Sequence, residues 1–151
     1  MIYLAFAFAI GCMIPLQAAI NNQLKAHVAD STVMASFVSF AVGTLALGAI
    51  VSLTEMRWKA LAGIADAKAW QLTGGLLGAV FVFGTTLLVP KIGAAKMVAL
   101  ILAGQVLVSL LLDHHGWIGL AAREITPLRI AGAILVVAGV VLVNYEQLFV
   151  R

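Results

Sequence analysis

Residues 32–54 have the sequence TVMASFVSFAVGTLALGAIVSLT, which contains no charged side chain in 23 residues. A helix rises ~1.5 Å per residue, so a segment of this length is long enough to cross the hydrocarbon core of a bilayer. A transmembrane β-strand would instead be a segment of about ten residues with alternating polarity, and that pattern is absent. The stretch therefore predicts a transmembrane helix.

Four further apolar stretches of similar length flank this one, at residues 2–21, 70–89, 94–112 and 128–145. Charged side chains gather at their ends, as expected because a charge at the bilayer centre costs at least ~2.5–3.5 kcal/mol. Trp58, Trp70 and Trp117 also lie at span ends, where interfacial aromatic residues are enriched. We predict one all-α domain over residues 1–151, with five transmembrane helices.

The composition excludes several other classes of protein. Of the 151 residues, 64% are hydrophobic and 10% are charged, whereas soluble domains are about 45–50% apolar and about 25% charged. This excess excludes a soluble globular domain and a disordered or nucleic-acid-binding tail, despite a pI of 9.4. No positive charge precedes Lys25, so the first stretch is expected to be a retained span and not a signal peptide.

The sequence also argues against an enzyme. It contains no phosphate-binding loop, no paired catalytic carboxylates and no nucleophile beside a base. The single cysteine, Cys12, excludes an internal disulfide and a cysteine-based zinc site. We expect no cofactor and no metal.

Positive charges are almost evenly divided between the two sides of the membrane. Five spans place the termini on opposite sides, so the side of each loop follows by alternation. One side receives Arg57, Lys59, Lys68, Arg123 and Arg129, and the other receives Lys25, Lys91, Lys96 and Arg151. Orientation follows the asymmetry of Lys and Arg. This near balance fits either a weak bias toward one orientation or a dual topology, in which the chain inserts both ways and pairs antiparallel.

The fourth span carries a polar stripe. Gln105, Ser109 and Asp113 are four residues apart, so they share one helix face over about 12 Å. Embedded polar groups cost free energy unless they are paired or line a wet cavity. Gln105 and Ser109 are therefore candidates for substrate binding, and Asp113 with His114 for gating or proton coupling. The alternative is structural: Gln105 bonds a neighbouring helix and Asp113 is a solvated terminus.

The first span ends in polar residues after a proline. Pro15 removes a hydrogen bond from the helix, and broken helices at membrane depth are typical of transporter binding sites. Pro15 is therefore a candidate hinge, and Gln17 and Asn21, one turn apart, are candidate substrate ligands. The alternative is a kinked helix with a polar end. No Asp or Glu lies near the centre of any span, which favours neutral, zwitterionic or polar uncharged substrates.

Small residues predict close helix packing. In the third span, Gly74 and Gly78 form one stripe and Gly75 begins a second. Gly132 and Gly139 share a face of the fifth span, which is a candidate dimer contact. Residues 90–93 are expected to form the turn between the third and fourth spans, and residues 55–69 form either an interfacial helix or a solvated loop.

Several of these segments together resemble the YdcZ family, small bacterial inner-membrane proteins of the drug/metabolite transporter superfamily. The resemblance rests on Gly11 with residues 15–21, residues 74–79, Pro90 with Gly93, Gly104-Gln105, residues 113–117, and Arg129 with Gly132. It implies a five-helix unit that occurs singly, as gene pairs or as fused copies, with the two copies in opposite orientations. It implies no particular substrate.

We therefore expect a secondary transporter of a small organic solute in the bacterial inner membrane. Two inverted copies, or one copy and a close paralogue, would form a ten-helix dimer that works by alternating access. Gln17, Asn21 and Gln105 of both copies would line its cavity. The alternatives are a channel-like oligomer and a structural or regulatory membrane subunit without transport activity.

Overall fold

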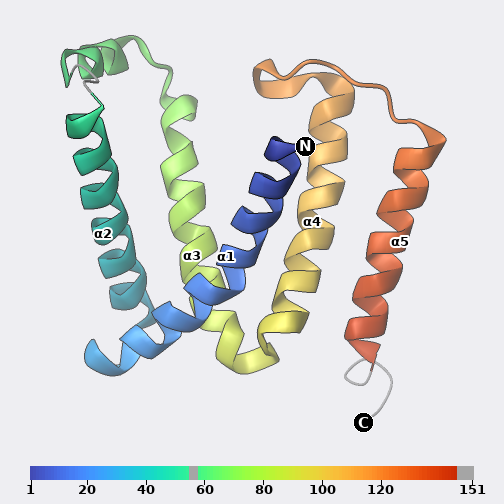
Figure 1. Ribbon diagram of the computed structural model, residues 1–151, viewed down its shortest axis with the longest axis horizontal. Helices are drawn as coiled ribbons and strands as arrows, with labels where there is room; N and C mark the ends of the chain where they lie inside the picture. Colours follow the sequence, from blue (N-terminus) through green and yellow to red (C-terminus); the bar gives the residue numbers. More distant parts are fainter. Residues whose placement is uncertain (55–57, 146–151) are drawn as a thin grey trace. The chain divides into compact units, whose positions relative to one another are not determined.

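The computed structural model describes residues 1–54 and 58–145, and within these ranges it contains helices and no β-strand. Five α-helices follow one another along the chain (Figure 1): α1 (Ile2–Leu24), α2 (Thr32–Leu53), α3 (Thr73–Ile92), α4 (Ala94–His115) and α5 (Pro127–Val143). The predicted all-α fold is confirmed.

Helix ends are set by local capping. Ser31 precedes α2 and accepts a hydrogen bond from the Met34 backbone N–H, and Thr126 does the same for Arg129 ahead of α5. Both hydroxyls satisfy one of the free N–H groups that begin every helix. Helix α4 ends at Gly116, whose φ of +62° is the left-handed conformation that favours glycine.

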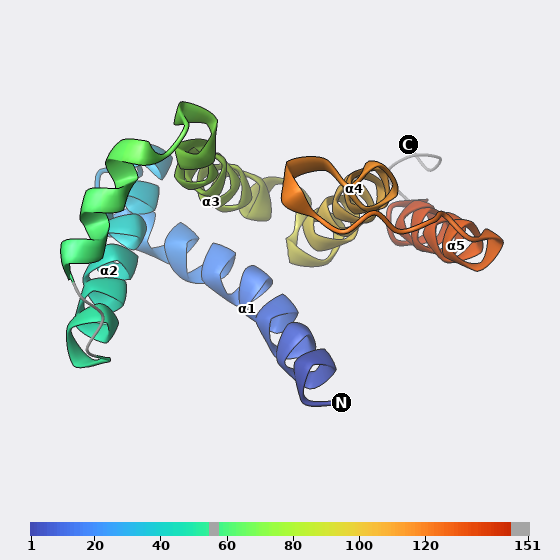
Figure 2. The same cartoon turned by 90° about the horizontal axis from the view of Figure 1, so that it is seen from above.

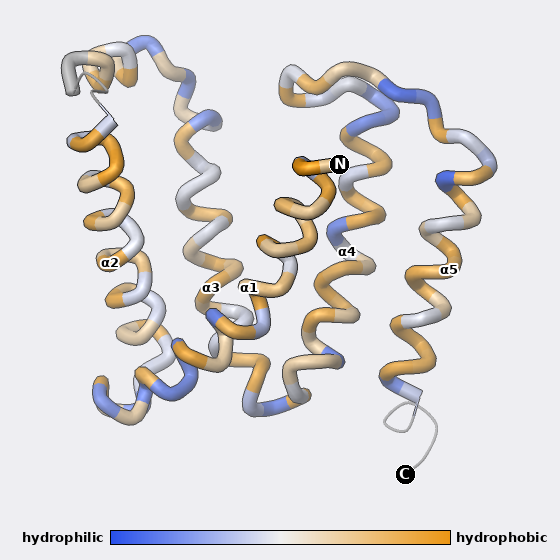
Figure 3. Tube along the Cα trace, in the orientation of Figure 1, coloured by the Kyte–Doolittle hydropathy of each residue, from blue (hydrophilic) through white to orange (hydrophobic). Residues whose placement is uncertain are grey.

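Helices α1 to α4 are each long and apolar enough to cross a membrane, and α5 is an apolar helix of 17 residues. Figure 3 shows the pattern along the chain: the helices are mainly hydrophobic, and the hydrophilic residues gather in the connections. The predicted spans agree with these helices to within three residues at each end. A membrane-crossing role for α5 stays a prediction.

The turn expected at residues 90–93 was wrong in its extent: α3 continues through Pro90 to Ile92, so Gly93 (φ +81°) alone separates α3 from α4. Pro15 lies inside α1, which is helical on both sides of it, and its role as a hinge stays a prediction. A proline removes one N–H from the hydrogen-bond ladder. At Pro90 that loss falls in the last turn of the helix, where it does not end α3.

The connection between α2 and α3 is helical where it is described. Residues Trp58–Asp66 form the 3₁₀-helix η2, and Ala69–Leu72 form η3. The helical alternative is therefore confirmed for residues 58–66, while its position at the membrane interface stays a prediction. Glu55 and Arg57 lie outside the described residues.

The chain divides into two compact units, Met1–Lys91 and Ile92–Arg151. In the first unit the helices converge at the end where α1 ends, α2 begins and α3 ends, and they diverge toward the N-terminus of α1 (Figures 1 and 2). We call this convergence the closed end. The buried side chains of the first unit are Ala18, Asn21, Ala35, Ser36, Val82, Thr85 and Thr86.

The second unit is a pair of helices, α4 and α5, that lie side by side and are joined by a loop. An open groove of about 750 Å³ runs between them. The groove is entirely apolar, with walls formed by Leu107, Leu110, Leu111, Ile125, Ile130, Ala133, Ile134, Val137 and Ala138. Large apolar side chains are exposed along all five helices, as expected of helices that contact lipid or another chain.

Candidate functional site

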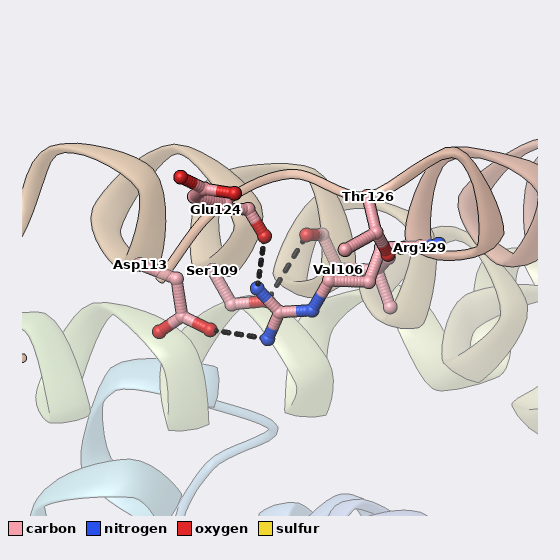
Figure 4. A network of polar contacts seen from close by, with 6 residues as sticks. All are labelled: Val106, Ser109, Asp113, Glu124, Thr126 and Arg129. Carbon is pink, nitrogen blue, oxygen red and sulfur yellow. Dashed lines mark hydrogen bonds and ion pairs between the residues drawn. The ribbon is translucent and has the colours of Figure 1, made fainter. Parts of the chain in front are cut away.

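An ion pair joins the end of α4 to the start of α5. The Nη2 atom of Arg129 donates to the Oδ2 atom of Asp113 over 2.8 Å, and Nη1 approaches the Glu124 carbonyl at 3.5 Å. Figure 4 shows the guanidinium between these two acceptors. The Arg129 and Asp113 side chains are 32% and 28% exposed, so the pair is partly screened by solvent or headgroups and partly enclosed.

The same turn is fixed by backbone contacts. The Arg123 N–H donates to the Asp113 carbonyl over 2.7 Å, which brings the connecting loop back onto α4. A Cβ atom at Gly116 would lie 3.1 Å from the Leu120 carbonyl oxygen and 3.2 Å from the Ala122 Cβ. Glycine at this position therefore allows the close return of the loop.

The two histidines beside Asp113 interact with their own segment. His115 Nδ1 lies 3.0 Å from the Leu111 carbonyl, and its ring stacks on Trp117 with centroids 4.5 Å apart. His114 is exposed and meets the edge of the His115 ring. The structure thus pairs Asp113 with Arg129, and no hydrogen bond or ion pair joins Asp113 to His114 in residues 58–145.

Gln105 and Ser109, the two predicted substrate ligands of α4, are exposed. The Ser109 hydroxyl donates to the Val106 carbonyl of its own helix over 3.0 Å. Gln105 lies at the middle of α4, and its amide has no hydrogen bond to any described residue.

The two predicted ligands of α1 have different surroundings. Gln17 is exposed, whereas Asn21 is 3% exposed and belongs to the closed end of the first unit. Among the described residues, two buried side-chain atoms have no hydrogen-bond partner, the Nδ2 atom of Asn21 and the Oγ1 atom of Thr86. The spacing of Gln17 and Asn21 therefore does not translate into equal burial.

The predicted packing glycines differ in what they contact. An added Cβ at Gly78 would lie 3.3 Å from the Phe40 ring of α2, so this glycine lets α2 approach α3. An added Cβ at any of four other positions, Gly74, Gly75, Gly132 and Gly139, would meet nothing within 4 Å. No other part of the described chain therefore packs closely against these four glycines.

Two residues of these sites, Arg129 and Thr86, were not among those predicted from the sequence. Arg129 begins the span that follows Asp113, and the alternation of loops already placed both on one side, so a pairing signal was present. Thr86 carried no signal, because helical hydroxyls ordinarily bond to their own backbone. No three His, Cys, Asp or Glu side chains gather as a metal site in the part of the chain that the structure describes.

The apolar helices, the charges confined to their ends and the polar side chains within them define a multi-pass helical membrane protein. The family described as "Putative inner membrane exporter, YdcZ" matches residues 2–142, and the chain belongs to this family. It is 32% identical over 146 residues to the inner membrane protein YdcZ of Escherichia coli (strain K12), with 93% of each chain covered. No solved structure matches.

These relationships confirm the predicted family and the location. The protein is a multi-pass protein of the inner membrane, and its family supports a transport role.

Proposed function

We propose that the chain exports a small organic solute by alternating access, as an antiparallel homodimer whose two copies share one cavity. The observation that carries the proposal is the position of Gln105. Its amide lies at the middle of α4, is exposed on the single chain, and has no hydrogen bond to a described residue. Lipid cannot satisfy an amide at that depth, so a second chain or a polar cavity must cover it.

Gln17 supports the same arrangement from α1. It is exposed on a helix whose first 12 residues are all exposed. An antiparallel two-fold axis in the membrane plane would bring mid-membrane positions of two copies together while keeping their ends apart. Gln17 and Gln105 of both copies then orient the solute by hydrogen bonds, with Ser109 one turn from Gln105.

The second copy also accounts for the open packing surfaces. A Cβ at Gly132 or Gly139 would meet nothing within 4 Å in the chain, although α5 is apolar from Ile130 to Val143. Glycines on one face let helices of different chains approach closely. We therefore assign the glycine face of α5 to the dimer contact. The near-equal positive charge on the two sides of the membrane allows the inverted orientation that this dimer needs.

The ion pair between Asp113 and Arg129 provides the gate in this mechanism. It fixes α4 to α5 at one end of the helix pair. Breaking the pair lets the two helix ends separate at the cavity mouth, and protonation of the carboxylate is one way to break it. We assign to His114, the exposed neighbour of Asp113 in the sequence, the role of passing a proton to that mouth.

The substrate class follows from the absence of charge. Within the described parts of α1 to α5, acidic side chains occur only at Asp113, in the last turn of α4. An exporter that exchanges a cation for protons needs a buried carboxylate near the middle of the membrane. The described helices of this chain carry no carboxylate at that depth. The amides of Gln17 and Gln105 instead suit neutral or zwitterionic solutes that both donate and accept hydrogen bonds.

Export from proteoliposomes tests the proposal. Vesicles containing the purified protein are loaded with an equimolar mixture of isotope-labelled sugars, nucleosides and amino acids, and the released compounds are identified by mass spectrometry. We expect saturable release of a restricted subset, and loss of most of that release in Gln105→Ala. Gln23→Ala, which removes an exposed amide at the end of α1, serves as the control and retains it. Unchanged release in Gln105→Ala would remove the proposed site, and release without saturation would indicate a channel.

A further inference from the structure

The buried interior of the first unit is largely polar, although its helices are apolar. Four of its seven buried side chains are polar, namely Asn21, Ser36, Thr85 and Thr86. None of them is charged. Each lies one or two turns inside a helix end, since Asn21 precedes the end of α1 by three residues and Thr86 precedes the end of α3 by six.

Two of these groups are satisfied locally. The Ser36 hydroxyl donates to the Thr32 carbonyl over 2.9 Å, and the Thr85 hydroxyl lies 3.1 Å from the Val82 carbonyl. Other hydroxyls in or next to the helices do the same; they belong to Thr44, Ser52, Thr54, Thr73 and Ser109. Most of these serine and threonine hydroxyls therefore donate to a backbone carbonyl three or four residues earlier in the chain.

Thr86 departs from that pattern. It is fully buried, yet its Oγ1 atom has no partner among residues 1–54 and 58–145. Four residues later stands Pro90, which has no N–H to donate to the Thr86 carbonyl. The backbone and the side chain of Thr86 thus both lack the partner that a residue in a regular helix would have.

Asn21 presents a complementary donor. Its side chain is 3% exposed, and its Nδ2 atom has no acceptor in the described part of the chain. A buried polar group without a partner destabilises the fold, because it has given up its hydrogen bonds to water. A ligand that offers a matching acceptor and donor to these two groups of the first unit removes that cost.

We infer that Asn21 and Thr86 line a binding site, at the closed end of the first unit, for a small uncharged solute that carries an amide or hydroxyl group. Asn21 Nδ2 donates to an oxygen of the solute. Thr86 Oγ1, which both donates and accepts, bonds its N–H or O–H group. The inference deepens the proposed function and rests on it: this is a second, enclosed station for the solute, beyond the mid-membrane cavity lined by Gln17 and Gln105.

Alkylation of cysteines by iodoacetamide tests this site without knowledge of the natural solute. Iodoacetamide carries an uncharged amide, and its reaction with a thiol forms a C–S bond and releases iodide. The full-length protein is used in a Cys12→Ala background, because Cys12 is exposed and would react. Thr86→Cys is compared with Thr85→Cys, the adjacent buried position whose hydroxyl already has a partner.

We expect Thr86→Cys to react at least about tenfold faster than Thr85→Cys, and this excess to fall by about tenfold when Asn21→Leu is added, as for the loss of one hydrogen bond. Charged iodoacetate should react without that excess. Equal rates at positions 85 and 86 would overturn the inference. The inference would also be overturned if Thr86→Cys reacted fast but at the same rate with Asn21→Leu added and with iodoacetate as reagent. Such a result would indicate a water-filled space that does not bind the amide group.

The unfolding midpoint of Thr86→Val gives a second, independent measurement. Valine has the shape of threonine without its hydroxyl, so removing an unpartnered hydroxyl should leave the midpoint unchanged or raise it. A lower midpoint would show that the hydroxyl is bonded in the resting protein and would contradict the inference.

If alkylation behaves as expected while proteoliposomes show no export, the site stands and the proposed function fails. If export is observed while alkylation does not behave as expected, the site fails alone.

Discussion

Arg129 and Asp113 meet at 2.8 Å across the junction of two helices, sixteen residues apart in the chain. Asp113 lies in the last turn of α4 and Arg129 in the first turn of α5. The pair therefore fixes one end of the helix pair, while an open apolar groove separates other parts of α4 and α5. A contact of this kind can control how far the two helices separate at that end.

The ion pair predicts a coupling between the two residues. We expect Asp113→Asn and Arg129→Gln each to lower the unfolding midpoint slightly, and the double variant to lower it by less than the sum. The coupling should be about 0.2–1 kcal/mol, because both side chains are about one third exposed. Thermal unfolding of the detergent-solubilised variants, arranged as a double-mutant cycle, measures it.

Arg123→Gln is the control for that cycle, since Arg123 contacts Asp113 through its backbone N–H and not through its side chain. It should show no coupling to Asp113→Asn. Additive effects of the Asp113 and Arg129 variants would mean that the pair contributes nothing to holding the helices together.

Gly116→Ala should destabilise the protein. The residue has φ +62°, which costs any residue with a Cβ about 1–2 kcal/mol, and the added Cβ would press on the Leu120 carbonyl at 3.1 Å. Gly43→Ala is the matched variant, because Gly43 lies within α2 and its Cβ would meet nothing within 4 Å. The unfolding midpoint should fall for Gly116→Ala and stay constant or rise for Gly43→Ala. Equal midpoints would contradict the role of Gly116 in the loop.

The fold was largely predictable because charge limits where a membrane helix can lie. Residues 32–54 contain no charge, and the structure places α2 over Thr32–Leu53. The error at Pro90 has a physical cause: the hydrogen bond that this proline removes falls in the last turn of α3, where its loss does not end the helix. The sequence alone does not show on which side of the proline the helix ends.

The site was less predictable because it depends on which helix faces meet. Gln17 and Asn21 have the spacing of one face, yet Asn21 is buried and Gln17 exposed. Thr86 looks like the other helical threonines until its hydroxyl is seen without a partner. Such differences arise from tertiary packing, which spacing along a single helix does not determine.

The dimer contact on α5 makes a prediction about oligomeric state. Gly132→Leu with Gly139→Leu should separate the dimer into monomers, since leucine would block close approach of a second chain while meeting nothing within its own chain at Cβ. Light scattering of the purified, detergent-solubilised protein measures the mass of the assembly. Gly43→Leu, on α2, is the control and should stay dimeric. A dimer that survives both leucines would place the contact on another face.

The central claim is that two copies of this chain pair in opposite orientations, and the side reached by the C-terminus tests it most directly. Two fusions are compared in living bacteria: alkaline phosphatase, which is active outside the inner membrane, and green fluorescent protein, which is fluorescent inside. Both reporters should be active at the C-terminus, in comparable amounts. Adding positive charge to one set of loops, for example by Gln71→Arg, should shift the ratio of the two signals. Activity of a single reporter, unchanged by added charge, would contradict the antiparallel homodimer.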